Sequence, residues 1–182
     1  MRRVLLAMVC GAALAAAQGP PGTSGAGSAV QWVRQHPVAA RTLPTGRATA
    51  IALQFEVDAD KHINSSKPTS EQLIATRLKL EPPTDVSIGA IRYPAGHDFT
   101  FTFAPDEKLN VYTGAFQVTA SLLASRNAPL GVQRVHGELH YQACNDRACF
   151  PPKKLPVSFD VRIVRGPGSI PSNPRQSPHI HH

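Results

Sequence analysis

Hydrophobic residues alternate with polar or small residues in several separate stretches of the chain. These stretches lie at residues 51–57, 78–80, 99–103, 116–122, 135–141 and 155–163. Because successive side chains of a strand point to opposite faces of a sheet, a period of two places each apolar set on one face. Turn signals rich in proline, glycine, asparagine and aspartate separate the stretches, among them residues 104–106. Several short strands with regular breaks predict an all-β fold, a β-sandwich with flexible tails.

Two other segments carry weaker structural signals. Residues 70–75 form a short helical candidate, with Ser70 as its N-cap. Trp32 stands close to Val30 and Val33, beyond a linker rich in glycine and proline. We expect this segment to pack on the sandwich as an edge strand, with a binding role for Trp32 as the alternative.

The amino terminus has the pattern of a secretory signal peptide. A basic start at residues 1–3 precedes an apolar run at 4–17, which ends in three alanines. We expect cleavage near Ala17, which removes Cys10 and leaves a periplasmic or secreted chain. The expected organisation is a signal peptide at 1–17, a linker at 18–29, a sandwich domain at 30–165 and a disordered tail at 166–182.

The composition narrows the class of function. The chain has 182 residues, of which 17 are proline and 13 are glycine, and a formal net charge of +7. Lys153 and Lys154 form the one basic pair after the signal peptide, and no basic block is interleaved with aromatic residues. Nucleic-acid binding is therefore not expected. Because no apolar run reaches the ~18–20 residues of a membrane span, we expect none in the mature chain.

The two cysteines that remain after cleavage lie in one connection between the last two predicted strands. Four residues separate Cys144 from Cys149, and Asn145–Asp146 favours a turn that brings the sulfurs together. An exported chain meets oxidising conditions, so a disulfide can form there. In the chain-entropy model, a loop of about six residues stabilises a fold by only ~2 kcal/mol. The spacing therefore favours thiol–disulfide exchange, with a structural disulfide and a metal site as open alternatives.

Charged and histidine residues near the cysteines bear on both kinds of chemistry. Arg147 between the cysteines and Lys153 after them favour a thiolate electrostatically. His136 and His140 could add two nitrogen ligands for zinc or copper. Residues four apart on a strand are separated by ~13 Å, so we expect these histidines to face solvent instead.

The cysteines stand inside a longer motif. Residues 141–144 read Tyr-Gln-Ala-Cys, and residues 149–152 read Cys-Phe-Pro-Pro. The pair resembles the YQxC…C[YF]PP signature of the amino-terminal periplasmic domain of DsbD, the thiol:disulfide interchange protein. Segments 62–65 and 111–118 are similar to family segments ahead of this motif, so the resemblance covers about residues 47–164.

The resemblance implies both a fold and an activity. It implies an immunoglobulin-like sandwich with the cysteine pair on a hairpin at its edge. It implies a redox-active dithiol, with no bound cofactor, that takes electrons from a membrane donor or a thioredoxin-like module. Those electrons pass on to thioredoxin-like periplasmic proteins, which is a protein-disulfide reductase activity. By the motif, Cys144 and Cys149 are the exchanging pair, Cys149 forms the mixed disulfide first, and Tyr141 and Gln142 support the loop.

The sequence departs from the family's pattern in three respects. Its loop between the cysteines is one residue shorter than in many members. The family's cap loop carries an aromatic residue over the disulfide, but the corresponding residues 106–110 have none. We therefore expect Leu109 or Tyr112 to shield the sulfurs less well. Counterparts of the family's membrane domain and terminal thioredoxin-like domain are not found, so we expect a separate electron donor.

Asp106 and Glu107 are expected either to carry protons for the thiols or to form a solvated turn.

Two other functions are rivals to an exchange module. They are an immunoglobulin-like binding adaptor with a structural disulfide and a metal chaperone. Replacing both cysteines by serine would leave partner binding by an adaptor intact, whereas an exchange module would lose electron transfer.

Overall fold

The computed structural model describes residues 30–101 and 104–167, and its regular structure there consists of strands. In chain order these are β1 Val33–Gln35, β2 Arg41–Pro44, β3 Ala48–Val57, β4 His62–Asn64, β5 Arg77–Glu81, β6 Val86–Arg92, β7 His97–Phe101, β8 Ala104–Tyr112, β9 Ala115–Ala124, β10 Gly131–Tyr141, β11 Ala143–Cys144 and β12 Lys153–Val164. No helix among the described residues is long and apolar enough to cross a membrane. The predicted signal peptide and linker, and the tail beyond Pro167, lie outside the described residues.

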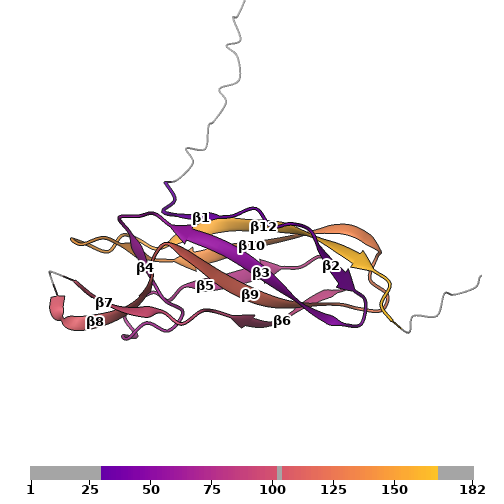
Figure 1. Cartoon of the computed structure of the whole chain (residues 1–182), viewed down its shortest axis with the longest axis horizontal. Coiled ribbons are helices and arrows are strands. Elements are labelled where there is room, and N and C mark those ends of the chain that lie inside the picture. The colour runs from indigo at the N-terminus through magenta and orange to yellow at the C-terminus, as the bar shows by residue number, and fades with distance from the viewer. Residues whose placement is uncertain (1–29, 102–103, 168–182) are drawn as a thin grey trace, which may run out of the picture.

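The strands form three four-stranded sheets (Figure 1). Sheet A has the order β1-β3-β9-β6, sheet B the order β2-β12-β10-β5, and sheet C the order β11-β4-β8-β7. The chain starts in sheet A with β1 and crosses to sheet B with β2, which pairs parallel to β12. The expected all-β class, an immunoglobulin-like sandwich, is confirmed.

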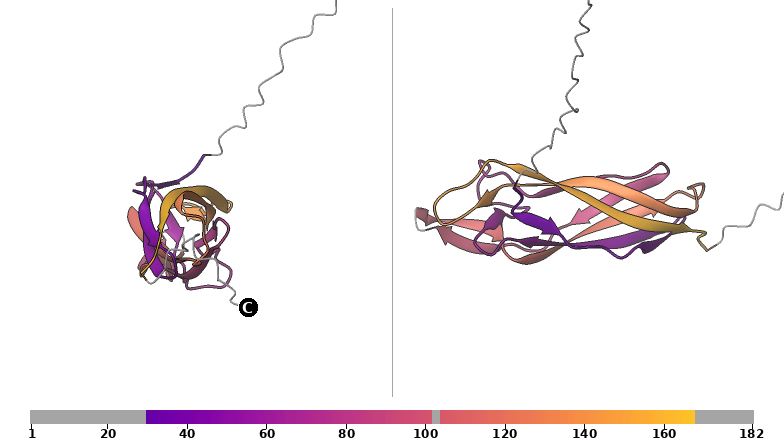
Figure 2. Two further views of the ribbon diagram at one scale, coloured as in Figure 1. Left: turned by 90° about the vertical axis from the view of Figure 1, so that its right-hand side faces the viewer. Right: turned by 90° about the horizontal axis from the view of Figure 1, so that it is seen from above.

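Sheets A and B contribute the main hydrophobic core. Leu53 and Phe55 of β3 and Val118 of β9 are fully buried, as are Leu139 of β10 and Val161 of β12. These are positions that the alternating pattern places on inner faces. Burying each such side chain stabilises the fold by about 1.5–3 kcal/mol. The end-on view in Figure 2 shows strands of both sheets surrounding this core.

A long antiparallel ladder carries the chain to the cysteine connection. The pairing of β10 with β12 runs without interruption from Gly131 opposite Ile163 to Tyr141 opposite Lys153. The connection between these strands, orange in Figure 1, lies at the same end of the molecule as the β7–β8 hairpin. The ladder therefore presents the connection at one pole of an elongated sandwich, where a partner can approach it.

The segment 70–75 is a turn, so the predicted helix is wrong. The Leu73 amide donates to the Ser70 carbonyl over 3.2 Å, and the chain then continues without helical structure. Six residues close too few backbone hydrogen bonds to offset the cost of nucleating a helix. The side-chain amide of Asn64 instead donates to the Ile74 carbonyl over 3.0 Å, which holds the segment against β4.

The β7–β8 hairpin corrects two further expectations. Residues 104–106, predicted as a turn, and 106–110, predicted as a cap loop, all belong to strand β8. Leu109 and Val111 of β8 are buried, and Lys108 is exposed, so this strand also follows the period of two. The stretch predicted as a strand at 99–103 is described through Phe101, and residues 102–103 lie outside the described part.

Candidate redox site

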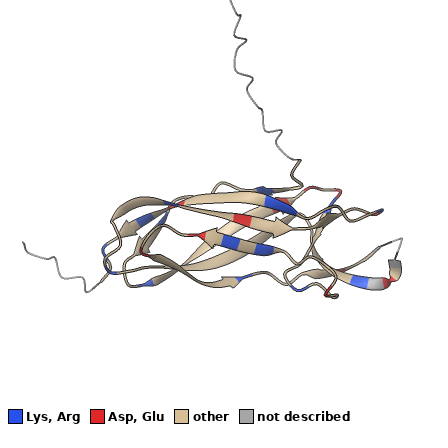
Figure 3. Cartoon of the chain, turned by 180° about the vertical axis from the view of Figure 1, so that it is seen from behind, with Lys and Arg blue, Asp and Glu red and all other residues tan. Residues whose placement is uncertain are grey.

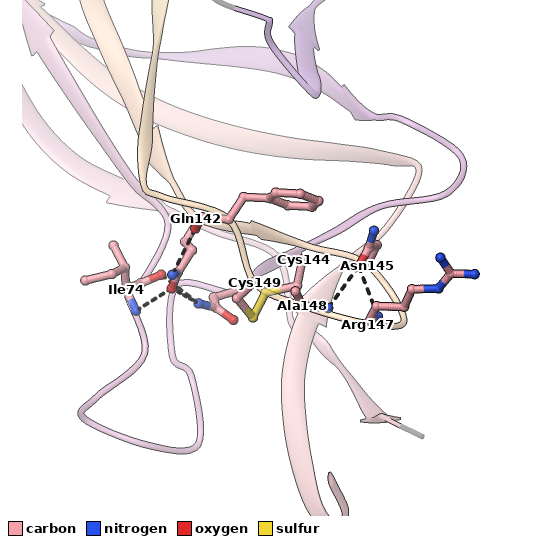
Figure 4. Close-up of a disulfide and its surroundings, with 9 residues drawn as sticks. Ile74, Gln142, Cys144, Asn145, Arg147, Ala148 and Cys149 are labelled. Atoms are coloured by element: carbon pink, nitrogen blue, oxygen red, sulfur yellow. Dashed lines mark hydrogen bonds between the residues drawn. A yellow bond between two sulfur atoms is a disulfide. The ribbon is translucent and has the colours of Figure 1, made fainter. Parts of the chain in front are cut away.

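The disulfide joins Cys144, the last residue of β11, to Cys149 in the connection leading to β12. The sulfurs are 2.07 Å apart and the Cα atoms 3.9 Å apart, and the two residues form an antiparallel bridge. Strand β11 continues the course of β10 after Gln142 and pairs with β4, with Cys144 opposite His62. The disulfide thus lies at the edge strand of sheet C (Figure 4).

Asn145 folds the four residues between the cysteines into a closed turn. Its side-chain oxygen accepts hydrogen bonds from the amides of Arg147 and Ala148, each over 3.0 Å (Figure 4). Its own amide donates to the Ala148 carbonyl over 3.0 Å. Because asparagine bonds nearby backbone amides in this way, it stabilises the tight loop locally.

The two cysteines differ sharply in exposure. Cys144 has no accessible surface, whereas Cys149 is exposed. Cys144 belongs to a small apolar cluster with Leu109 and Val111 of β8. An attacking thiolate must approach a sulfur along the disulfide axis, so access decides which sulfur it reaches. The geometry leaves Cys149 as the accessible partner of the pair.

Phe99 of β7 supplies the aromatic cover that the sequence comparison did not find in residues 106–110. It packs against the cluster that contains Cys144, together with Leu73, and it pairs with Leu109 in the hairpin. Leu109 also lies in this cluster. Tyr112 lies elsewhere, in the main core, where its ring stacks on Phe116 at 4.9 Å between centroids. The aromatic residue was missed because β7 reads as an ordinary core strand.

Gln142 ties the cysteine connection to two neighbouring segments. Its side-chain amide donates to the Phe150 carbonyl over 3.2 Å, which closes the connection across the disulfide. Its side-chain oxygen accepts from the Asn64 side chain at 3.2 Å and from the Ile74 amide at 3.4 Å (Figure 4). One side chain thereby links β4, the turn after it and the residues on both sides of the cysteines.

Tyr141 fixes the segment that precedes β1 beside the same connection. Its ring is fully buried, and its hydroxyl donates to the Gln31 side chain over 2.7 Å and accepts from the Trp32 amide at 3.2 Å. Burial raises the pKa of the Tyr141 phenol, so it stays a donor at neutral pH. Trp32 in turn packs on Phe150, with ring centroids 4.4 Å apart, and Lys153 lies over the Trp32 ring at 4.4 Å.

His62 is the titratable side chain nearest to Cys144 in the sheet register. It is 3% exposed and its ring stacks on Phe99 with centroids 4.6 Å apart. Burial lowers the pKa of His62 below its ordinary value of 6.5, while the charge of Asp146 raises it and His97 lowers it further. The imidazole is therefore neutral at neutral pH. The resemblance includes residues 62–65 but gives His62 no role, because only the pairing of β4 with β11 brings it to the cysteines.

The lowered pKa of His62 predicts a stability loss on mild acidification. Since the fold disfavours the imidazolium, the unfolded chain binds more protons than the folded chain below pH 6.5. The free energy of unfolding should then fall as the pH falls from 6.5 toward 5, and stay level with respect to this group above 6.5. Urea unfolding at each pH measures it, and in His62→Gln this part of the slope should disappear. An unchanged slope in that variant would assign the effect to another group.

The acidic and histidine residues singled out by sequence belong to β8 and β10. Asp106 is exposed on β8, and the side chain of Glu107 lies outside the described part. His136 is exposed on β10, and His140 bonds to Glu138 at 2.8 Å. Among the described residues, no three histidine, cysteine, aspartate or glutamate side chains are grouped to hold a metal ion. On the face drawn in Figure 3, lysine and arginine are spread along the strands among acidic and uncharged residues.

Comparisons with known proteins place these features in context. The sequence profile of the family described as thiol:disulfide interchange protein DsbD, N-terminal, matches residues 29–160. The reduced DsbD N-terminal domain of Neisseria meningitidis is 18% identical, aligns over 71% of this chain and 83% of its own, and has a TM-score of 0.42. The N-terminal periplasmic domain of ScsB from Proteus mirabilis is 14% identical, over 70% of this chain and 45% of its own, with a TM-score of 0.46.

A third solved structure is a complex between the DsbD and PilB N-terminal domains of Neisseria meningitidis. It is 15% identical to this chain and covers 61% of it and 73% of its own chain, with a TM-score of 0.36. A comparison with curated proteins gives no match. The sequence resemblance carried by the cysteine motif is thus matched by the family profile over most of the described sandwich.

Proposed function

Because the chain belongs to the family of the N-terminal domain of the thiol:disulfide interchange protein DsbD, we propose that its Cys144–Cys149 pair passes electrons to partner proteins. The observation that carries this proposal is the contrast between an exposed Cys149 and a fully buried Cys144 under the β7–β8 hairpin. A purely structural disulfide does not need an exposed cysteine, whereas an exchange reaction requires one that a partner can reach.

The exchange runs in two displacements that conserve atoms and electrons. In the dithiol form, the Cys149 thiolate attacks one sulfur of a partner's disulfide, and the partner's other sulfur leaves as a thiolate. The Cys144 thiol then loses its proton and attacks the Cys149 sulfur, and the partner's first sulfur leaves as a thiolate. The partner has gained two electrons and the Cys144–Cys149 disulfide has reformed. The dithiol is itself the reductant, so the reaction requires no bound cofactor.

The surrounding residues prepare the pair for this chemistry. Phe99 and Leu109 cover the buried sulfur, and Gln142 and Tyr141 hold the connection in place on both sides. A small thiol can reach Cys149 but not the covered Cys144, so attack on the disulfide is directed to Cys149. We propose thioredoxin-like proteins as the partners and a thioredoxin-like or membrane protein as the electron donor.

The proposed setting is outside the cytosol, where a disulfide persists. The signal peptide expected at residues 1–17, with cleavage near Ala17, supports export to the periplasm or the medium. The structure describes the chain from residue 30 onward, so the expected signal peptide and linker lie outside the described residues.

The reduction potential of the disulfide tests the proposed function. We expect a midpoint above about −300 mV when the protein is equilibrated in dithiothreitol buffers, within the range of exchange proteins rather than structural disulfides. Circular dichroism of the reduced protein should show the sandwich intact, because a loop this short contributes only ~2 kcal/mol. A potential far below that limit would contradict exchange and favour the binding adaptor with a structural disulfide.

A further inference from the structure

The pairing of β4 with β11 sets an imidazole beside the buried cysteine. Cys144 and His62 are direct partners in this antiparallel register. Residues directly opposite in such a pair point to the same face, with Cβ atoms about 4.5–5.5 Å apart. Phe99 packs against the cluster of Cys144 and also stacks on His62, so both side chains share one enclosed space beneath the hairpin.

Proton transfer is a difficulty for the buried cysteine in the proposed reaction. Cys144 has to become a thiolate in the second displacement, yet it has no accessible surface and packs against Leu109 and Val111. An apolar environment raises the pKa of a thiol and disfavours its anion. Bulk water cannot take the proton directly from a group that it does not reach. The reaction therefore requires a base within the enclosed space.

We propose, building on the exchange function above, that His62 accepts the proton of the Cys144 thiol in the step that resolves the mixed disulfide. The S–H bond of Cys144 breaks as the proton passes to an imidazole nitrogen, and the sulfur's electron pair attacks the Cys149 sulfur. The partner sulfur leaves with the electron pair of the broken disulfide bond. The imidazolium then returns its proton to the departing thiolate or to water, which restores neutral His62.

The charges around His62 suit a group that is neutral before the reaction and protonated only during the resolving step. Asp146, in the loop after β11, acts on His62 with a negative charge that stabilises the imidazolium, and His97 of β7 acts in the opposite direction. Burial is the largest influence and keeps the resting ring unprotonated. A general base is most effective when its pKa lies near the working pH. Asp106, the acidic residue proposed from sequence, is exposed on β8.

Stopped-flow oxidation of the fully reduced protein by oxidised glutathione separates the two steps. The first step joins glutathione to Cys149, and the second releases it as Cys144 closes the disulfide. We expect His62→Gln to slow the second step at least tenfold at pH 7, as loss of a general base typically costs about 10²–10⁴-fold. The first step should be unchanged. His62→Phe, which keeps a ring to stack on Phe99, should show the same loss.

The controls separate proton transfer from packing and from failure of the proposed function. His136→Gln, which removes an exposed histidine on β10, should leave both steps at the wild-type rate. In the wild-type protein the rate of the second step should rise with pH only to a plateau reached below pH 7. In His62→Gln the rate should keep rising up to and beyond the pKa of an ordinary thiol, about 8.5.

Three outcomes would overturn the inference. They are a normal second step in His62→Phe, equal slowing of both steps, or a wild-type rate that climbs tenfold per pH unit up to pH 8. The wild-type profile decides the question even if both variants fail to fold. A disulfide that neither forms nor breaks in the wild-type protein would instead contradict the exchange function itself.

Discussion

Cys144→Ser is expected to turn the protein into a trap that stays joined to its partner. Cys149 can still attack a disulfide, but no second thiol is left to release the mixed disulfide. Cys149→Ser should form no mixed disulfide, because the remaining thiol has no accessible surface. Both variants should transfer no electrons in a complete cycle, a larger effect than any other substitution predicted for this chain. Intact mass spectrometry after incubation with oxidised glutathione measures the trapped species directly.

The same pair of variants tests which sulfur reacts first. Trapping in Cys149→Ser, with none in Cys144→Ser, would reverse the assignment made from exposure. Both proteins should remain folded, since the disulfide closes a loop of only about six residues and contributes ~2 kcal/mol. A far-ultraviolet circular dichroism spectrum like that of the wild type is the control. The double serine variant, tested alongside, should bind no glutathione.

Phe99→Ala is expected to let water reach the Cys144 sulfur and so to speed reduction of the disulfide by small thiols. The alanine loses a stacking contact with His62 and part of an apolar contact with the Cys144 cluster, together worth about 1–2 kcal/mol. Since each 1.4 kcal/mol changes an equilibrium about tenfold, the open form of the hairpin should become roughly tenfold more populated. Dithiothreitol attacks the exposed Cys149 and expels Cys144 as a thiolate, which water reaches only in the open form. The rate of reduction, followed under conditions where opening is in rapid equilibrium, should therefore rise by the same factor.

A neighbouring substitution distinguishes uncovering from general loosening of the hairpin. Thr100→Ala removes an exposed side chain from the same strand and should leave the rate of reduction unchanged. Phe99→Leu retains an apolar side chain and should fall between the wild type and Phe99→Ala. If Phe99→Ala reacts with dithiothreitol no faster than the wild type, the cover over Cys144 does not control the reduction of the disulfide.

The long strands of the sandwich are predictable because their own side chains encode them. In β3, β9, β10 and β12 the apolar residues alternate over many positions, and the same residues are buried in the structure. Strand β6 was missed, since glycine and alanine at 89–90 interrupt its pattern, and its pairing with β9 shifts between Ile88 and Ile91. The short strands β2, β4 and β11 are held by partners distant in sequence, which no local pattern reveals, whereas β1 is the edge strand expected beside Trp32.

Some residues of the redox site could likewise be predicted from the sequence, and others could not. Cys144 and Cys149 lie close together in sequence, so their pairing is visible without a structure. Phe99 and His62 reach the disulfide only through the β7–β8 and β4–β11 ladders, which depend on the whole fold. A phenylalanine in an alternating stretch and a histidine near a turn have many ordinary explanations. Residues that act across a sheet are therefore the ones that sequence reasoning loses.

The direction of β12 determines where another protein can be attached to this domain. The strand leaves the cysteine connection at Lys153 and runs twelve residues, roughly 36 Å, to the opposite pole. The chain before β1 instead lies beside the connection, where the Lys153 side chain bonds to the Val30 carbonyl. A fluorophore or fusion protein joined after residue 167 would stand clear of the reacting sulfurs. One joined just before residue 30 would start next to them, and a tethered thioredoxin-like protein there would meet the disulfide at high effective concentration.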